Sequence, residues 1–194
     1  MLIKVSDKIS DCFLHQHFVP AGLAQECVDE VLALPLERET LLMYGRRITV
    51  PRESLWIADD GCVYRYAGIT RNPHPWTPRL TQLRELITGH YPGMNSVLLN
   101  VYRHGEHYMG YHHDNEPEID QSCGIFSVSL GQTRDFLLKQ VSDKSQVVKV
   151  PLSDRDGLYM GPETLRDWLH ALPKRKRAHA CRINLTFRAI KKTV

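Results

Sequence analysis

A chain of 194 residues, 42% of them apolar, is long enough to fold as one globular domain with a substantial core. No apolar run is long enough for a membrane helix, and the N-terminus lacks the apolar region of a secretory signal. The five cysteines form no CxxC pair, which argues against a disulfide framework or a zinc ribbon. We therefore expect a reducing compartment, the cytoplasm or, in a eukaryote, the nucleus. The net charge of +3 permits nucleic-acid binding without requiring it.

Two amphipathic helices and a set of hairpins are predicted in the first half of the chain. The first helix covers residues 20–34, and its apolar stripe consists of Leu23, Cys27, Val28, Val31 and Leu32. Residues 41–70 are typical of strands or hairpins, with turns at Gly45 and at 59–61. The second helix covers residues 77–91, with Thr77 as N-cap and Pro78 at the first helical position. Its stripe consists of Leu80, Leu83, Leu86, Ile87 and Tyr91.

After Pro92 the sequence changes to short runs rich in β-branched and aromatic residues, separated by turn formers and charges. These predicted strands are SVLLNVY, GIFSVSL, RDFLLK, QVVKVPL, GLYM and CRINLTF. Two helices followed by several short strands indicate helices packed on one face of a β-sandwich or open barrel.

The stretch GYHHDNE, residues 110–116, gathers side chains that can bind a metal or transfer protons. In an extended chain, His112 and Asp114 point to one face and His113 to the other. A metal then needs a further ligand, and downstream of Asp114 the only histidines are His170 and His179. With His170 the set is the two-histidine, one-carboxylate arrangement typical of non-haem Fe(II) oxygenases. Taken alone, the pattern also fits a polar loop and a surface or capping histidine.

The last predicted strand, RINLTFR, has two different faces. Period-two alternation places Arg182, Asn184, Thr186 and Arg188 on one face and the apolar residues on the other. Two arginines on an inward face are costly without anions, and a dicarboxylate ligand would pair with both. The run NVY adds Asn100 and Tyr102 on one face of another strand. The alternative is an edge strand whose arginines form surface ion pairs.

The ordered set NVY, GYHHDNE, RDF, DWLHALP and RINLTFR resembles the AlkB family of Fe(II)/2-oxoglutarate-dependent nucleic-acid dealkylases, over about residues 41–188. MYGRRITVPR and VYRYAGIT resemble the branch that acts on duplex DNA. The resemblance implies an α+β fold with a double-stranded β-helix (jelly-roll) core, two N-terminal supporting helices and a β-hairpin substrate lid. It implies a single dioxygenase domain over residues 1–194. Helices and nucleotide-recognition hairpins would occupy 1–92, and the catalytic core would occupy 93–194.

The resemblance also implies oxidative demethylation of N-alkylated bases in DNA, such as 1-methyladenine and 3-methylcytosine, as direct-reversal repair by a monomer. The cofactors would be Fe(II), 2-oxoglutarate and O2. The catalytic metal ligands would be His112, Asp114 and His170. The 2-oxoglutarate ligands would be Asn100, Tyr102, Arg182, Thr186 and Arg188. The substrate contacts would be Met43, Tyr44, Gly45, Arg46, Tyr64, Arg65, Tyr66, Asn115 and Glu116.

Within that set, Tyr66 would stack on a base flipped out of single- or double-stranded DNA, and residues 43–45 would fill the gap it leaves. Candidate phosphate contacts are Arg46, Arg47, Arg52, Lys174, Arg175, Lys176 and Arg177. The alternatives are a dioxygenase of the same family acting on RNA or protein, a catalytically inactive nucleic-acid-binding module, and a zinc-stabilised structural domain.

Overall fold

Two antiparallel β-sheets form the core of the computed structural model. The structure describes residues 1–43, 46–66 and 69–192. At residues 41–43, 46, 48, 64–66 and 69–71 it describes the backbone alone. The large sheet has the strand order β1 (Leu2–Lys4), β2 (Cys12–His15), β13 (Gly157–Met160), β10 (Ile125–Gly131), β15 (Arg182–Arg188), β8 (Ser96–Tyr102) and β5 (Glu53–Ala58). The small sheet has the order β12 (Val147–Leu152), β11 (Arg134–Gln140), β14 (Trp168–Leu172) and β9 (Met109–His112).

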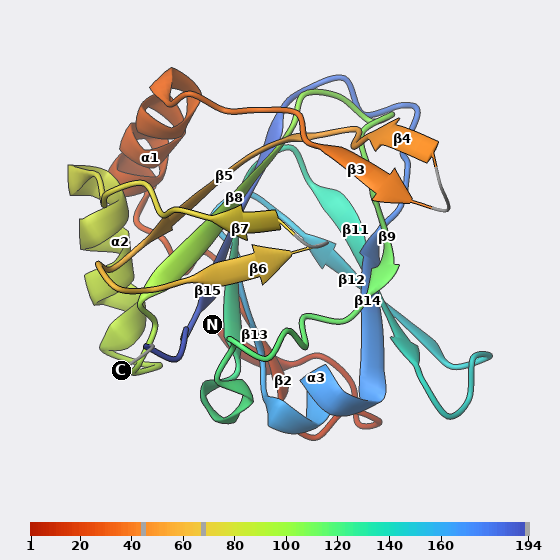
Figure 1. Cartoon of the computed structure of the whole chain (residues 1–194). Coiled ribbons are helices and arrows are strands. Elements are labelled where there is room, and N and C mark those ends of the chain that lie inside the picture. The colour runs from red at the N-terminus through yellow and green to blue at the C-terminus, as the bar shows by residue number, and fades with distance from the viewer. Residues whose placement is uncertain (44–45, 67–68, 193–194) are drawn as a thin grey trace.

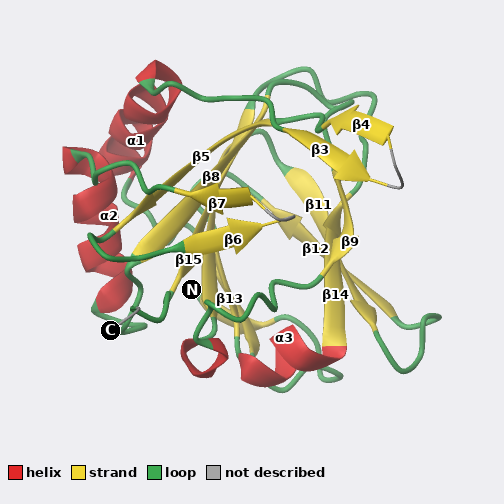
Figure 2. Cartoon of the chain, viewed as in Figure 1, coloured by secondary structure: helices red, strands yellow, loops and turns green. Residues whose placement is uncertain are grey.

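The two sheets share one winding pattern. Strands β8, β15, β10 and β13 are neighbours in the large sheet, and β9, β14, β11 and β12 are neighbours in matching order in the small sheet. The chain therefore passes back and forth between the sheets, as in a double-stranded β-helix (Figure 2). This confirms the predicted jelly-roll core. Strands β8 and β13 have the bounds that the sequence predicts.

Helices α1 (Ala21–Ala33) and α2 (Pro78–Thr88) lie side by side against the large sheet (Figure 1). Their buried residues join a core cluster with the apolar face of β15, which is Ile183, Leu185 and Phe187. The polar residues of the same strand are thereby turned to the other side, toward the small sheet. Both predicted helices are present, but α2 ends at Thr88, so Tyr91 of the second stripe lies beyond the helix. Leu32 of the first stripe, in the last turn of α1, is 38% exposed.

The N-terminus of α2 is capped by a residue from α1. Thr77 occupies the expected N-cap position, but its hydroxyl makes no bond to the helix backbone and donates instead to Glu30. The Glu30 carboxylate accepts the backbone N–H groups of Arg79 and Leu80. These are two of the N–H groups that a helix leaves unpaired at its start. Glu30 therefore ties the two helices together.

We expect Glu30→Ala to lower the free energy of unfolding by about 1 kcal/mol, the usual cost of losing a cap. Urea denaturation measures this loss. Glu26→Ala is the matched control, because Glu26 is an exposed residue of the same helix that pairs only with the Arg79 side chain. Such surface pairs contribute little. An equal loss from both variants would contradict the capping role of Glu30.

Two small hairpins and a short helix complete the described chain. The hairpins are β3 (Thr40–Met43) with β4 (Arg46–Thr49), and β6 (Tyr64–Tyr66) with β7 (Ile69–Arg71). They confirm the strands expected in residues 41–70, whereas their role as a substrate lid stays a prediction. The expected turn at Gly45 lies outside the described residues. Gly61 has a φ of 80°, a backbone conformation that suits glycine, in the expected turn.

The sequence analysis did not predict several other elements of the described chain. The N-terminal strand β2 extends the large sheet by pairing with β13, which is distant in sequence, and β1 pairs with β2 at the edge. Helix α3 (Pro162–Asp167) leads directly into β14, and a single 3-10 turn covers Gln121–Cys123. None of the helices in the described ranges has the length and apolar character needed to cross a membrane.

Candidate metal centre and its cavity

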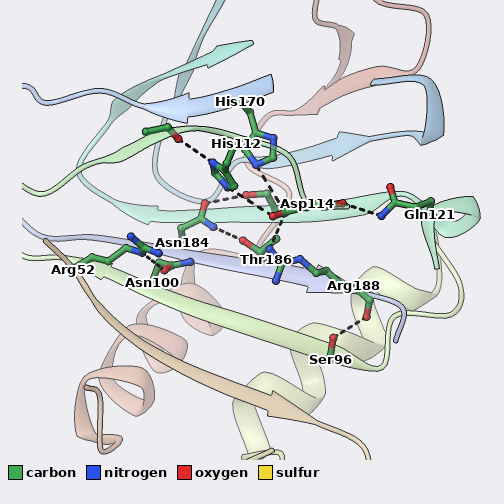
Figure 3. A network of polar contacts seen from close by, with 12 residues as sticks. Arg52, Ser96, Asn100, His112, Asp114, Gln121, His170, Asn184, Thr186 and Arg188 are labelled. Atoms are coloured by element: carbon green, nitrogen blue, oxygen red, sulfur yellow. Dashed lines mark hydrogen bonds and ion pairs between the residues drawn. The ribbon is translucent and has the colours of Figure 1, made fainter. Parts of the chain in front are cut away.

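The chain brings the histidines and the aspartate of the predicted metal set together. His112 is the last residue of β9, and its register partner on the neighbouring β14 is His170. Asp114 follows two residues after β9 and turns toward both (Figure 3). Its carboxylate oxygens lie 3.7 Å from His112 Nε2 and 3.8 Å from His170 Nε2. The three potential ligand atoms all lie within 4.8 Å of one another.

The protonation states of these groups suit a metal cation. His112 Nδ1 lies 2.9 Å from the Gly110 carbonyl, which can only accept, so Nδ1 carries a proton and Nε2 is the nitrogen turned toward Asp114. Burial, followed by the nearby His112, lowers the pKa of His170 to about 3, so this imidazole is neutral at physiological pH. Burial alone would raise the pKa of Asp114, but Arg188 and the two histidines hold it well below its usual range. The site therefore offers two imidazole nitrogens and one ionised carboxylate.

The spacer residue His113 points away from this site. Its Nδ1 lies 3.0 Å from the carbonyl oxygen of Leu165, in α3. The predicted alternation of faces is thus correct, although the strand itself ends at His112. The contact joins the loop that carries Asp114 to the segment that leads into β14.

We expect His113→Ala to retain turnover within about tenfold of the wild type, because the change removes a contact with the Leu165 backbone and no metal ligand. Loss of a group bonded directly to a ligand costs roughly 10- to 100-fold. Turnover and Mn(II) affinity, measured side by side, test this expectation. A loss as deep as that from changing Asp114 would show that His113 belongs to the metal-binding set.

A cavity of about 470 Å³, which includes space open to solvent, extends from the metal set between the two sheets and is lined by both polar and apolar side chains. Its lining includes the predicted polar face of β15, which is Arg182, Asn184, Thr186 and Arg188. Asn100 and Tyr102 of β8 and Ser127 of β10 line it as well. Ser127 was not predicted, although it alternates with the apolar Phe126 and Val128 in the same period-two pattern.

Arg182 is a buried cation without an anionic partner among the described residues. It is 1% exposed, and its Nη2 donates to Ser129 Oγ at 2.9 Å and to Asn184 Oδ1 at 3.0 Å. Its Nε has no hydrogen-bond partner in the described part of the chain. Burial lowers the pKa of Arg182 to about 10, which leaves the guanidinium charged at neutral pH. The cavity therefore holds a positive charge that an anionic ligand would stabilise.

Arg188, at the other end of β15, donates from Nη2 to Asp114 Oδ2 at 2.7 Å. Both side chains are 5% exposed, so this is a buried ion pair. The alternative of surface ion pairs on an edge strand is wrong, because β15 lies inside the sheet between β10 and β8. Gln121 Nε2 donates to the Asp114 carbonyl at 2.8 Å and fixes the same loop from the other side.

The predicted substrate contacts are only partly placed. Asn115 is exposed beside the metal set, and Glu116 lines a second cavity of about 340 Å³. This outer cavity shares Asn100, His112, Asp114 and Arg188 with the first one. Tyr44 and Gly45 lie outside the described residues. For five further residues in the hairpins only the backbone is described, and these are Met43, Arg46, Tyr64, Arg65 and Tyr66.

The candidate phosphate contacts divide into exposed and buried residues. Arg47 is exposed, and so is the basic run Lys174, Arg175, Lys176 and Arg177. Arg52, in contrast, is 5% exposed and donates from Nε to Asn100 Oδ1 at 2.7 Å. Arg52 is turned into the outer cavity, so its role as a phosphate contact stays a prediction with less support than that of the exposed residues.

Comparison with known proteins decides the family of the chain. The family model of the 2OG-Fe(II) oxygenase superfamily matches residues 11–188. The chain belongs to this superfamily. Oxygenases of this family use Fe(II), 2-oxoglutarate and O2. The solved structure described as "The structure of OsALKBH1" has the same fold, with a TM-score of 0.66, 19% identity and coverage of 91% of this chain and 97% of that one.

Curated relatives within the family are closer in sequence. DNA oxidative demethylase ALKBH2 from Homo sapiens is 38% identical over 157 residues, covering 76% of this chain and 60% of the relative. The protein of the same name from Arabidopsis thaliana is 31% identical over 209 residues, covering 93% of this chain and 67% of the relative. The human alpha-ketoglutarate-dependent dioxygenase alkB homolog 3 is 33% identical over 180 residues, covering 87% and 60%. The chain spans about three fifths of the human relatives it matches.

The residues present fit the cofactors of the oxygenase family. Two imidazoles and a carboxylate are the protein ligands of non-haem Fe(II) oxygenases, which leave positions open for other ligands. The unpartnered Nε of the buried Arg182 marks a place for an anion in the adjoining cavity. When bound, the iron and 2-oxoglutarate together supply oxidising power drawn from O2.

Proposed function

We propose that this oxygenase removes methyl groups from ring nitrogens of DNA bases, with 1-methyladenine and 3-methylcytosine as typical substrates. The relatives named DNA oxidative demethylase, up to 38% identical over 76% of the chain, carry the proposal. Hydroxylation of the N-methyl carbon gives a hemiaminal, whose C–N bond breaks to release formaldehyde and the unmodified base. The reaction would directly reverse alkylation damage.

We assign the residues of the inner cavity as follows. His112, Asp114 and His170 hold Fe(II). Asn100, Tyr102, Arg182, Thr186 and Arg188 hold 2-oxoglutarate, with Arg182 at a carboxylate of the co-substrate. The buried, charged guanidinium of Arg182 supports this assignment, since a planar fork of donors matches a carboxylate. Arg188 both faces the cavity and keeps the Asp114 carboxylate ionised.

The substrate base would approach through the outer cavity, because this cavity shares His112 and Asp114 with the inner one. A base buried in a duplex must first leave the stack. We assign contacts with the extruded base and its strand to the two hairpins, with Met43, Tyr44, Gly45, Arg46, Tyr64, Arg65 and Tyr66, and to Asn115 and Glu116. In this scheme residues 1–92 recognise the nucleotide and residues 93–194 catalyse.

The protein would act as a monomer in the cytoplasm or nucleus, and its free cysteines support a reducing compartment.

Formaldehyde and succinate release from matched methylated oligonucleotides tests the proposal. The set comprises single-stranded DNA, duplex DNA and RNA of one sequence. We expect release from DNA, with the duplex accepted as well as the single strand. Release from RNA alone would replace DNA with RNA as the substrate. Succinate formation without formaldehyde from any polymer would favour a protein substrate, and no release at all would favour an inactive binding module.

A further inference from the structure

A buried arginine lines the outer cavity, next to a residue that lines both cavities. Arg52 follows hairpin β3–β4 after a short turn and precedes β5, and it is 5% exposed. Its Nε donates to Asn100 Oδ1 at 2.7 Å, and the two side chains are drawn together in Figure 3. Asn100 is itself 4% exposed, in the middle of β8, and it lines both cavities. The bond therefore ties the end of the hairpin segment to a residue of the site.

This contact decides which end of the Asn100 amide faces the cavity. An arginine nitrogen can only donate, so the amide atom that faces Arg52 must be the oxygen. The amide nitrogen Nδ2 is then left for the cavity side. Among the described residues, the hydrogen bond of the Asn100 side chain is the one that its Oδ1 accepts from Arg52, and Nδ2 donates to no side chain or backbone group. Asn100 thus offers a donor to whatever occupies the cavity.

We propose that Arg52 is a positioning residue, which holds the Asn100 amide in the orientation that donates a hydrogen bond to 2-oxoglutarate. The inference rests on the proposed assignment of Asn100 to the co-substrate. Without Arg52 the amide is free to turn by half a rotation. It would then present its oxygen to the co-substrate, and two acceptors repel each other. Arg52 lines the outer cavity and not the inner one, so in this proposal it acts through Asn100.

Calorimetric titration of 2-oxoglutarate into Mn(II)-loaded protein, with O2 excluded, tests this role without turnover. We expect Arg52→Leu to weaken 2-oxoglutarate binding about fivefold, in line with the loss of one ordinary hydrogen bond. Mn(II) affinity should stay within about twofold, since Arg52 contacts none of the metal ligands through a hydrogen bond. Arg79→Leu, on the exposed side of α2, is the control and should bind as the wild type does.

The double variant separates positioning from simple attraction by a positive charge. In an Asn100→Ala background, Arg52→Leu should cause no further loss, because there is no amide left to orient. A fivefold loss that persists in this background would overturn the proposal and assign the effect to charge. Unchanged binding by Arg52→Leu in the otherwise wild-type protein would overturn it too.

Asn100→Asp provides a second test that does not depend on how well Arg52 variants fold. Aspartate keeps an acceptor for Arg52 but offers the cavity no donor. We expect it to bind 2-oxoglutarate at least as weakly as Asn100→Ala, and wild-type binding would overturn the donor role. None of these titrations contains nucleic acid. They therefore test the role of Arg52 in 2-oxoglutarate binding even if the protein does not demethylate DNA. A wild-type protein that binds no 2-oxoglutarate would reject the proposed function itself.

Discussion

Asp114→Asn is expected to reduce turnover by well over a hundredfold, because it removes the only anionic ligand of the proposed iron site. Changes to groups that merely orient a ligand cost roughly 10- to 100-fold, so loss of the ligand itself should exceed that range. Asparagine is the informative replacement here. Its side-chain oxygen still accepts the hydrogen bond from Arg188, whereas alanine would leave that buried guanidinium without its carboxylate. Breaking a buried pair in this way costs about 3–5 kcal/mol of stability.

The measurement has two parts. Formaldehyde release gives turnover, and Mn(II) titration of the metal-free protein gives affinity for the metal. Circular dichroism and thermal unfolding show whether the variant is folded. A folded Asp114→Asn protein with near wild-type turnover and Mn(II) affinity would refute the assignment of Asp114 as a ligand.

Arg182→Lys is expected to raise the KM for 2-oxoglutarate by about ten- to a hundredfold, although the positive charge is kept. A lysine cannot reproduce the planar pair of donors that a carboxylate accepts, and a charged hydrogen bond is worth about 1.5–3 kcal/mol. Lysine would also lose the hydrogen bonds that Arg182 donates to Ser129 and Asn184. Initial rates at varied 2-oxoglutarate measure the change.

Arg103→Lys serves as the matched control for that experiment. Arg103 makes two hydrogen bonds to Glu53 from a half-exposed position and does not line the cavity. Its KM for 2-oxoglutarate should equal that of the wild type. A KM that stays unchanged in Arg182→Lys would show that Arg182 does not bind a carboxylate of the co-substrate.

Local periodicity made much of the site predictable. Alternation with period two separates the polar and apolar faces of β15, and the structure confirms both faces. The same rule placed His112 and Asp114 together and His113 apart. Such patterns depend only on neighbouring residues along one strand, so they can be read before the fold is known.

Other features depend on residues far apart in the chain. Strand β14 carries His170, yet the run WLHAL lacks the β-branched residues that mark a strand. Strand β2 joins the sheet by pairing with the distant β13, and β1 pairs only onto β2. The Arg188–Asp114 ion pair joins a late strand to an earlier loop. Arg52 is a charged residue beside a proline, in a setting typical of the surface, and only its contact with Asn100 reveals why it is buried.

The most direct test of the central claim follows the methyl group itself. Purified protein is incubated with Fe(II), 2-oxoglutarate and duplex DNA that carries 1-methyladenine at one position, and the oligonucleotide and the released formaldehyde are both quantified. We expect unmodified adenine and formaldehyde to appear in equal amounts, and to disappear when iron or 2-oxoglutarate is omitted. A DNA base that keeps its methyl group while 2-oxoglutarate is consumed would contradict the account.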